Sequence, residues 1–121
     1  MEPESPIVLK RADRNRWTLT VAGQSEVTLA HDLVRRTFKP WIDEIRMAPV
    51  QSTSIALVGY DPATWNLVVE FQGGSRYLYL DVEPETAAPL LEPPAPGWSI
   101  GKYHSARIKA HPDLYPFRRV N

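Results

Sequence analysis

The strongest constraint on the fold is a run of three strand-like segments joined by two short turns. The segments "SIALVGY" (Ser54–Tyr60), "WNLVVEF" (Trp65–Phe71) and "YLYLDV" (Tyr77–Val82) are rich in β-branched and aromatic residues. Between them, "DPAT" has the chemistry of a turn, with proline at the second position, and "QGGSR" is a glycine hairpin signal. Because strands joined by such short turns pair antiparallel, we expect a three-stranded antiparallel meander over Ser54–Val82.

Two short helices are expected to follow the meander. Pro84 suits the first turn of a helix, and Pro89 makes that helix short or kinked, because an interior proline costs about 3 kcal/mol. The segment "PPAPG" (Pro93–Gly97) is a rigid break. It precedes a helix candidate over Ser99–Ala110, with Ser99 as its N-cap and Pro112 shortly beyond its end. The pattern therefore predicts an α+β fold.

The first 50 residues are expected to add strands or a helix to the same core. "RWTLTVAG" (Arg16–Gly23) alternates apolar and polar residues, which predicts a strand, and the segment Ser25–Ala30 is a candidate to pair with it. A helix or a strand fits His31–Lys39, whereas Trp41–Met47 has the spacing of an amphipathic helix. The first ten residues of the chain are polar and include two prolines, so they predict a loose terminus. We therefore expect residues 1–50 to form an N-terminal extension that packs on a domain formed by residues 51–121.

Composition narrows the class of protein. A chain of 121 residues is long enough for one compact domain, and 43% hydrophobic residues is ordinary for a globular chain. The absence of cysteine excludes disulfides, thiolate metal sites and cysteine nucleophiles. No apolar stretch is long enough to span a membrane, so we expect a cytoplasmic protein without membrane contact. The 14 basic and 14 acidic residues cancel, which argues against strong non-specific binding of nucleic acid.

Charge is distributed unevenly, and the basic C-terminal tail is the main candidate binding site. Residues 101–121 contain only one acidic residue, Asp113. The five basic residues of this tail are Lys102, Arg107, Lys109, Arg118 and Arg119. Lys102 and Lys109 fall on the helix side opposite Ile100, so they should face water. Basic groups interleaved with aromatic rings are what single-stranded nucleic acid requires. The alternative is an ordinary solvated helix face followed by an anchored C-terminal strand.

Tyr77 and Tyr79 lie two residues apart, so on a strand they point to the same face. A two-residue turn at Gly73-Gly74 would place Glu70 opposite Tyr77 and leave both tyrosines on the outer face, where they could stack on bases. A three-residue loop, Gly73-Gly74-Ser75, would place Phe71 opposite Tyr77 and bury both rings. One residue of slip exchanges the two faces.

The span from about Gln51 to Val120 resembles the KTSC domain, a small bacterial module found alone and at the C-terminus of some lysyl-tRNA synthetases. The resemblance lies in an ordered run of short motifs, Ser54-Ile55, Val58-Gly59-Tyr60-Asp61, Leu67-x-Val69-x-Phe71, Gly74, Tyr77-x-Tyr79, Val82, Leu90-Leu91, Gly97 and Tyr115-Pro116-Phe117-Arg118. The family pattern repeats apolar residues at the positions of Leu67, Val69 and Phe71 and of the two tyrosines, which favours one shared, buried face. The synthetase fusion implies an RNA-binding role.

The remaining polar residues favour structural roles. His104 falls between Ile100 and Ile108 on the face of the helix that should pack against the sheet. His104 and His111 are seven residues apart, and two histidines without a third ligand make a poor metal site. The acidic pairs Asp43-Glu44 and Glu83/Glu85 are typical of a solvated helix face. No nucleophile elbow or phosphate-binding glycine loop is present, so we expect no catalytic residues, no cofactor and no metal. We therefore expect a non-catalytic module that binds transfer RNA or single-stranded RNA, or alternatively a protein partner.

Overall fold

The computed structural model describes residues 7–21, 26–30, 33 and 45–121. The chain divides into two compact units, residues 1–40 and residues 41–121, which are described separately. The helix or strand predicted over His31–Lys39 lies outside the described residues, apart from Leu33. That the first unit packs on the core of the second stays a prediction.

The first unit contains a three-stranded antiparallel sheet in the order β1-β2-β3. It consists of β1 (Ile7–Arg11), β2 (Arg16–Val21) and β3 (Val27–Ala30). The strand predicted from Arg16 is confirmed, and so is its pairing with the following segment. The prediction of a loose terminus is wrong from Ile7 onward, because these residues pair with β2. Residues 7–11 do not alternate between apolar and polar types, so their sequence does not predict a strand. The strand forms through its pairing with β2.

A polar turn connects β1 to β2. The Asp13 carboxylate accepts hydrogen bonds from the Asn15 amide and the Arg16 guanidinium, both at 2.8 Å. The Arg11 guanidinium donates to the carbonyl oxygens of Asp13 and Arg14 and lies 5.3 Å from the centroid of the buried Trp17 ring. The arginine thus closes the turn and covers the indole of β2.

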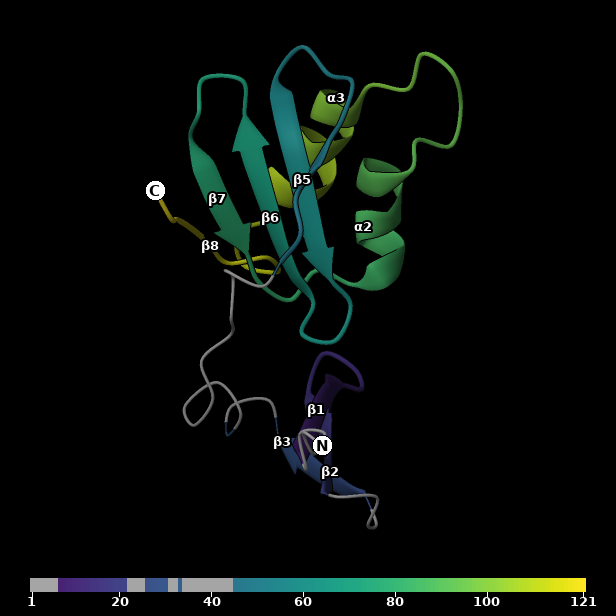
Figure 1. Ribbon diagram of the computed structural model, residues 1–121, viewed down its shortest axis with the longest axis vertical. Helices are drawn as coiled ribbons and strands as arrows, with labels where there is room; N and C mark the ends of the chain where they lie inside the picture. Colours follow the sequence, from purple (N-terminus) through teal and green to yellow (C-terminus); the bar gives the residue numbers. More distant parts are fainter. Residues whose placement is uncertain (1–6, 22–25, 31–32, 34–44) are drawn as a thin grey trace, which may run out of the picture. The chain divides into compact units, whose positions relative to one another are not determined.

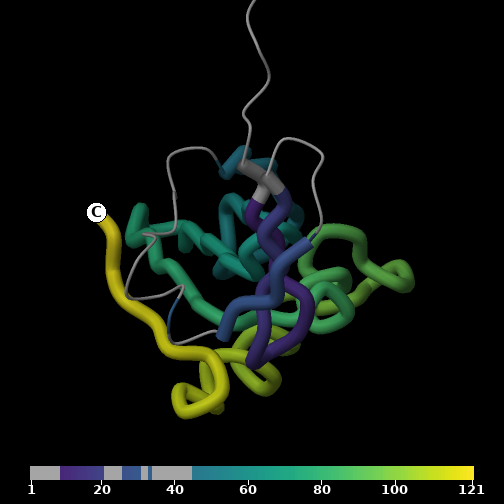
Figure 2. The backbone as a smooth tube through the Cα atoms, turned by 90° about the horizontal axis from the view of Figure 1, so that it is seen from below, coloured from purple at the N-terminus to yellow at the C-terminus, as the bar shows by residue number. Residues whose placement is uncertain are grey.

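The second unit is built on a five-stranded antiparallel sheet, in the order β4-β5-β6-β7-β8. Figure 1 labels four of these strands, β5, β6, β7 and β8. Its strands are β4 (Ala48–Pro49), β5 (Ile55–Asp61), β6 (Asn66–Phe71), β7 (Arg76–Tyr79) and β8 (Phe117–Arg119). The predicted meander is confirmed as β5, β6 and β7. Two short edge strands pair with its outer members. The C-terminal strand considered as the alternative for the tail is present as β8, whereas β4 was not predicted. In Figure 2 the C-terminal residues run along one edge of this sheet, which is the β7 side.

The segment before β4 differs from the predicted helix over Trp41–Met47. Its first four residues lie outside the described part, and Ile45, Arg46 and Met47 are not helical but lead directly into β4. The side chains of Ile45 and Met47 lie against Gly59 of β5. A Cβ at that position would be 2.6 Å from the Met47 sulfur and 2.7 Å from Ile45 Cγ2. Glycine is required there because the neighbouring segment passes so closely.

The register of the β6–β7 hairpin differs from both alternatives considered. Val69 pairs with Tyr77 and Leu67 with Tyr79, around a loop of Gln72, Gly73 and Gly74. The amide of Phe71 donates to Ser75 O, and the amide of Gly74 donates to Phe71 O, each at 2.8 Å. Gly74 has φ of 98°, which favours glycine. The loop is shifted by one residue relative to the expected three-residue loop, so the pairing moves by two and the tyrosines keep the predicted buried face.

The helical segments cover one face of this sheet (Figure 1). They are α2 (Pro84–Leu91), α3 (Ile100–His104) and η1 (Ser105–Lys109), a π-helical continuation of α3. The two helices predicted after the meander are therefore confirmed, with Pro84 in the first turn and Ser99 as an N-cap that accepts from the Lys102 amide. The change of winding after His104 was not predicted.

The main core lies between the sheet and these helices. It is formed by residues of β5, β6 and β7, together with Val82, Ala87, Leu90, Ile100, Ile108 and Tyr115. Val68 and Leu78, whose side chains point to the opposite face of the sheet, are also buried. The central strands of the second unit are therefore buried on both faces.

Candidate functional site

The five cations of the predicted site come from three elements. Lys102 lies on α3, Arg107 and Lys109 lie on η1, and Arg118 and Arg119 lie on β8. All five are exposed. In the part of the chain that the structure describes, none of the five forms an ion pair with a carboxylate. Their charges are therefore available to an anionic ligand.

The helical cations face water because α3 and η1 turn their apolar side toward the sheet. Ile100, His104 and Ile108 are buried, in line with the predicted packing face. Along η1, the Ala110 amide bonds to Ser105 O, five residues back, which is the spacing of a π-helix. Lys109 follows His104 by this same interval of five residues, so the two lie on adjacent turns.

Strand alternation separates the two arginines of β8. Arg119 pairs with Tyr77 and Phe117 pairs with Tyr79, so both point to the helix-covered face. Arg118 pairs with Leu78 and points to the opposite face. The tail therefore does not present its cations as one cluster. Arg119 shares a face with the helical residues, and Arg118 does not.

Phe117 is the exposed end of a row of rings on that shared face. Its ring centroid lies 5.7 Å from that of Tyr79 and 6.0 Å from that of Tyr77. Tyr79 is 2% exposed, whereas Phe117 is 48% exposed. The question of whether the two tyrosines form a surface platform is thereby settled by burial. Tyr79 is core and Tyr77 is partly buried, and the exposed aromatic ring beside them is Phe117.

His104 closes the inner end of this row. Its ring lies 5.0 Å from that of Tyr79 and 5.6 Å from that of Phe71, edge to face in both cases. Burial lowers the pKa of His104 to about 4, and the positive charge of Lys109 adds to the effect. Its Nε2 atom is buried without a hydrogen-bond partner. Burial also raises the pKa of Tyr79 to about 12. Near neutral pH, both side chains are uncharged core members.

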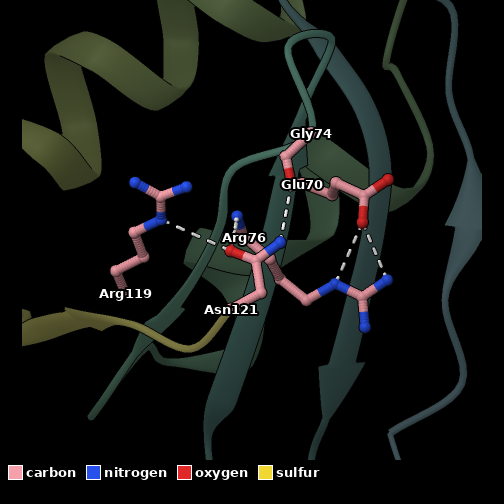
Figure 3. A network of polar contacts seen from close by, with 5 residues as sticks. All are labelled: Glu70, Gly74, Arg76, Arg119 and Asn121. Atoms are coloured by element: carbon pink, nitrogen blue, oxygen red, sulfur yellow. Dashed lines mark hydrogen bonds and ion pairs between the residues drawn. The ribbon is translucent and has the colours of Figure 1, made fainter.

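A polar clip holds β8 on the hairpin (Figure 3). The Asn121 side chain accepts a hydrogen bond from the Arg76 amide at 2.9 Å and donates one to Gly74 O at 2.7 Å. Arg119 Nε donates to the same Asn121 oxygen at 3.5 Å. In Figure 3 the Arg119 side chain and the Glu70–Arg76 ion pair, which spans 2.8 Å, extend to different sides of Asn121. The clip thus fixes the backbone that carries Phe117 and Arg119.

Of the acidic pairs considered from the sequence, only Glu83 and Glu85 lie among the described residues. Glu83 is the N-cap residue of α2, and Glu85 lies in its first turn, where a negative charge favours the helix dipole. Asp43 and Glu44 lie outside the described residues. Within the described ranges, no group of three or more histidine, aspartate or glutamate side chains could hold a metal ion, and no helix is long and apolar enough to cross a membrane.

The sequence identified the cations, but it did not show which of them share a face with an exposed ring. Tyr115 and Phe117 both lie just before the two arginines in the sequence, yet Tyr115 is buried and Phe117 is exposed. The alternation of β8 would have separated Arg118 from Arg119. A C-terminal strand was considered, but its bounds and its register with β7, which decide the face of each side chain, were not predicted.

Comparison with known proteins assigns residues 51–111 to a family model described as the KTSC domain. A protein of Tsukamurella paurometabola is 39% identical over 64 residues, which are 53% of this chain and 96% of the relative. An uncharacterized protein of Stutzerimonas stutzeri is 34% identical over 77 residues, 64% of this chain and all of the relative. The crystal structure of the KTSC domain protein YPO2434 from Yersinia pestis matches with a TM-score of 0.53 and 26% identity, covering 64% of this chain and 99% of that one.

Proposed function

The chain belongs to the KTSC domain family, and we propose that it is a non-catalytic RNA-binding module that acts in the cytoplasm. The observation that carries the proposal is the set of five exposed cations in the C-terminal part, which lack carboxylate partners among the described residues. The resemblance to a domain that also occurs at the C-terminus of some lysyl-tRNA synthetases supports RNA as the ligand.

Local charge, not total charge, is the basis of this function. The chain is neutral overall, so it lacks the long-range attraction of a strongly basic protein for nucleic acid. Binding therefore depends on short-range phosphate contacts, and the flexible Lys102 and Lys109 and the planar guanidinium groups of Arg107 and Arg119 can supply them. We expect modest affinity that falls as salt rises, because each phosphate contact releases counterions.

A protein partner is the second candidate, and a different surface favours it. All residues from Glu92 to Ser99 are exposed, and this loop contains three prolines. Leu91 and Trp98, at its two ends, are 45% and 37% exposed. Proline-rich segments are preformed ligands for aromatic grooves. This candidate predicts no binding of RNA and no strong dependence on salt.

The experiment is a titration of the full chain with labelled transfer RNA and with a random single-stranded RNA, at low and at physiological salt. If the four cations other than Arg118 contact phosphates of a single strand, the logarithm of the affinity falls with the logarithm of salt with a slope of about −2.8. Absence of binding at low salt would end the RNA proposal and leave the protein partner.

Matched charge reversals test where the RNA binds. The variant Lys109→Glu/Arg119→Glu should weaken binding at least tenfold and flatten the salt dependence. The control, Lys10→Glu/Arg46→Glu, makes the same change in net charge at two other exposed cations and should have little effect. Equal losses in the two variants would mean that binding follows net charge and not this site.

A further inference from the structure

Phe117 combines exposure to solvent with a fixed position. It is an apolar ring that is half exposed, and it is held in place by the two rings behind it. Tyr79 lies at 5.7 Å with a 34° tilt, and Tyr77 lies at 6.0 Å and 61°. A side chain that only anchored the strand would be covered, as Tyr115 is. Phe117 instead offers a fixed π surface to solvent.

The strand below Phe117 is also fixed. The Leu80 amide donates to Pro116 O at 2.8 Å, and the Val120 amide donates to Arg76 O at 2.9 Å, so β8 is bonded to β7 on both sides of the ring. The Asn121 clip extends this pairing to the loop of the hairpin. Because the backbone and the ring are both positioned before any ligand arrives, little conformational entropy is lost on binding.

Two cations belong to the elements at the two ends of this row of rings. Arg119 is two residues further along β8, and its Nε is bonded to Asn121, which orients the guanidinium. Lys109 belongs to the turn of η1 next to His104, and His104 contacts Tyr79, the ring behind Phe117. The ring contacts thus run from His104 to Tyr79 and on to Phe117. Lys109 lies on η1 near His104, and Arg119 lies two residues from Phe117 on β8.

From this arrangement we propose that Phe117 is the stacking site for one unpaired base of a single-stranded RNA, with Lys109 and Arg119 on the phosphates on either side. The inference rests on the proposed function and deepens it. An exposed π face combined with nearby cations is the composition of single-strand binding surfaces. A paired base is already stacked on its neighbours and cannot use the ring, so this site selects single strands over duplex RNA.

The test uses a short single-stranded RNA and the same strand annealed to its complement, with the full chain. Phe117→Leu keeps an apolar side chain on the two tyrosines and removes the π face. We expect it to weaken binding of the single strand by roughly 5- to 100-fold, the value of one stacked base, and to leave duplex binding unchanged. Phe117→Trp, which keeps the ring, should bind as the wild type does.

A second exposed aromatic residue provides the control. Trp98 is also partly exposed, but it contacts Tyr103 and lies outside this row of rings. Trp98→Leu should therefore leave binding of the single strand unchanged, and a loss in this variant equal to that of Phe117→Leu would overturn the proposal. A 2-aminopurine base in the RNA reports stacking directly, and its change in fluorescence on binding should be lost in Phe117→Leu only.

The possible failures can be distinguished. Binding to both RNAs that depends on salt, with less than a threefold effect of Phe117→Leu, would overturn the stacking site but keep RNA as the ligand. Absence of binding of either RNA by the wild type at low salt would overturn both proposals. Unchanged thermal unfolding of the Phe117 variants would show that any loss comes from the binding surface and not from the fold.

Discussion

The centre of the second sheet and its C-terminal edge are held by different interactions. The central strand β6 pairs on both sides, and its residues from Asn66 to Val69 are buried on both faces. The edge strand β8 has three residues, all exposed, and depends on pairing with β7 and on the Asn121 clip. Stability is thus concentrated in the centre, and the edge presents charged and aromatic groups to solvent at little cost to the core.

The largest effect is expected at Tyr79, where the centre and the ring row meet. Tyr79→Ala should lower the free energy of unfolding by about 3–5 kcal/mol, because a fully buried ring is removed and a cavity is left beside His104. Tyr77→Ala should cost less, since that ring is only partly buried. Urea unfolding measures both, and Tyr79→Phe is the control that keeps the ring. A loss below about 1 kcal/mol for Tyr79→Ala would contradict its place in the core.

The next effect concerns pH and the buried imidazole. The folded-state pKa of His104 is about 4, below the ordinary value of 6.5, so the folded state favours the neutral form. The stability that comes from this group is fully present above pH 6.5 and is lost as pH falls from 6.5 toward 4, by about 3 kcal/mol in all.

The variant His104→Phe isolates this contribution, because it keeps a ring against Tyr79 and Phe71 but cannot be protonated. Urea unfolding at pH 7, 5 and 4 should show a steeper loss for the wild type than for the variant. If the free energy of unfolding fell equally with pH in both proteins, His104 would be protonated in the folded state without penalty. The helical face would then open to water more easily than the burial of His104 indicates.

The smallest effect is expected at the edge. Asn121→Ala removes the bonds to the Arg76 amide and to Gly74 O, and should cost about 1 kcal/mol because both groups can bond to water instead. Amide hydrogen exchange should become faster at Val120 and Leu80, which pair β8 with β7, and stay slow at Val69. Equal acceleration at all three amides would show that the edge and the centre unfold as one unit.

The sequence predicted the parts of the fold that local signals determine. Turn residues and β-branched strands located the meander, and Pro84 and Ser99 located the helix starts. The hairpin register was wrong because Gln72 joins the two glycines in the loop, which places Gly74, with φ of 98°, at the left-handed last position. A loop of Gly73–Ser75 would have placed Ser75 there, and the prediction did not use this preference for glycine. The helix predicted to end at Met47 was wrong over its described residues because contact with Gly59 decides their conformation.

The candidate site was predicted in composition but not in arrangement. Each cation was identified and each is exposed, since charged residues rarely lie inside a fold. The separation of Arg118 from Arg119 and the exposure of Phe117 arise from β8, a strand of three residues that exists only through its pairing with β7. Such non-local pairing leaves no periodic signal in a short segment.

The distance along the chain between β7 and its clip has a consequence for synthesis. Asn121 lies 45 positions after Arg76, the residue whose amide it caps. At a translation rate of about 5–20 residues per second, the ribosome needs roughly 2–9 s to add those residues. Until β8 pairs with it, β7 is the open edge of the sheet, and an unpaired edge can pair with a strand of another chain. Completion of β8 ends this exposure, so the strand that presents the cations also protects the newly made domain from aggregation.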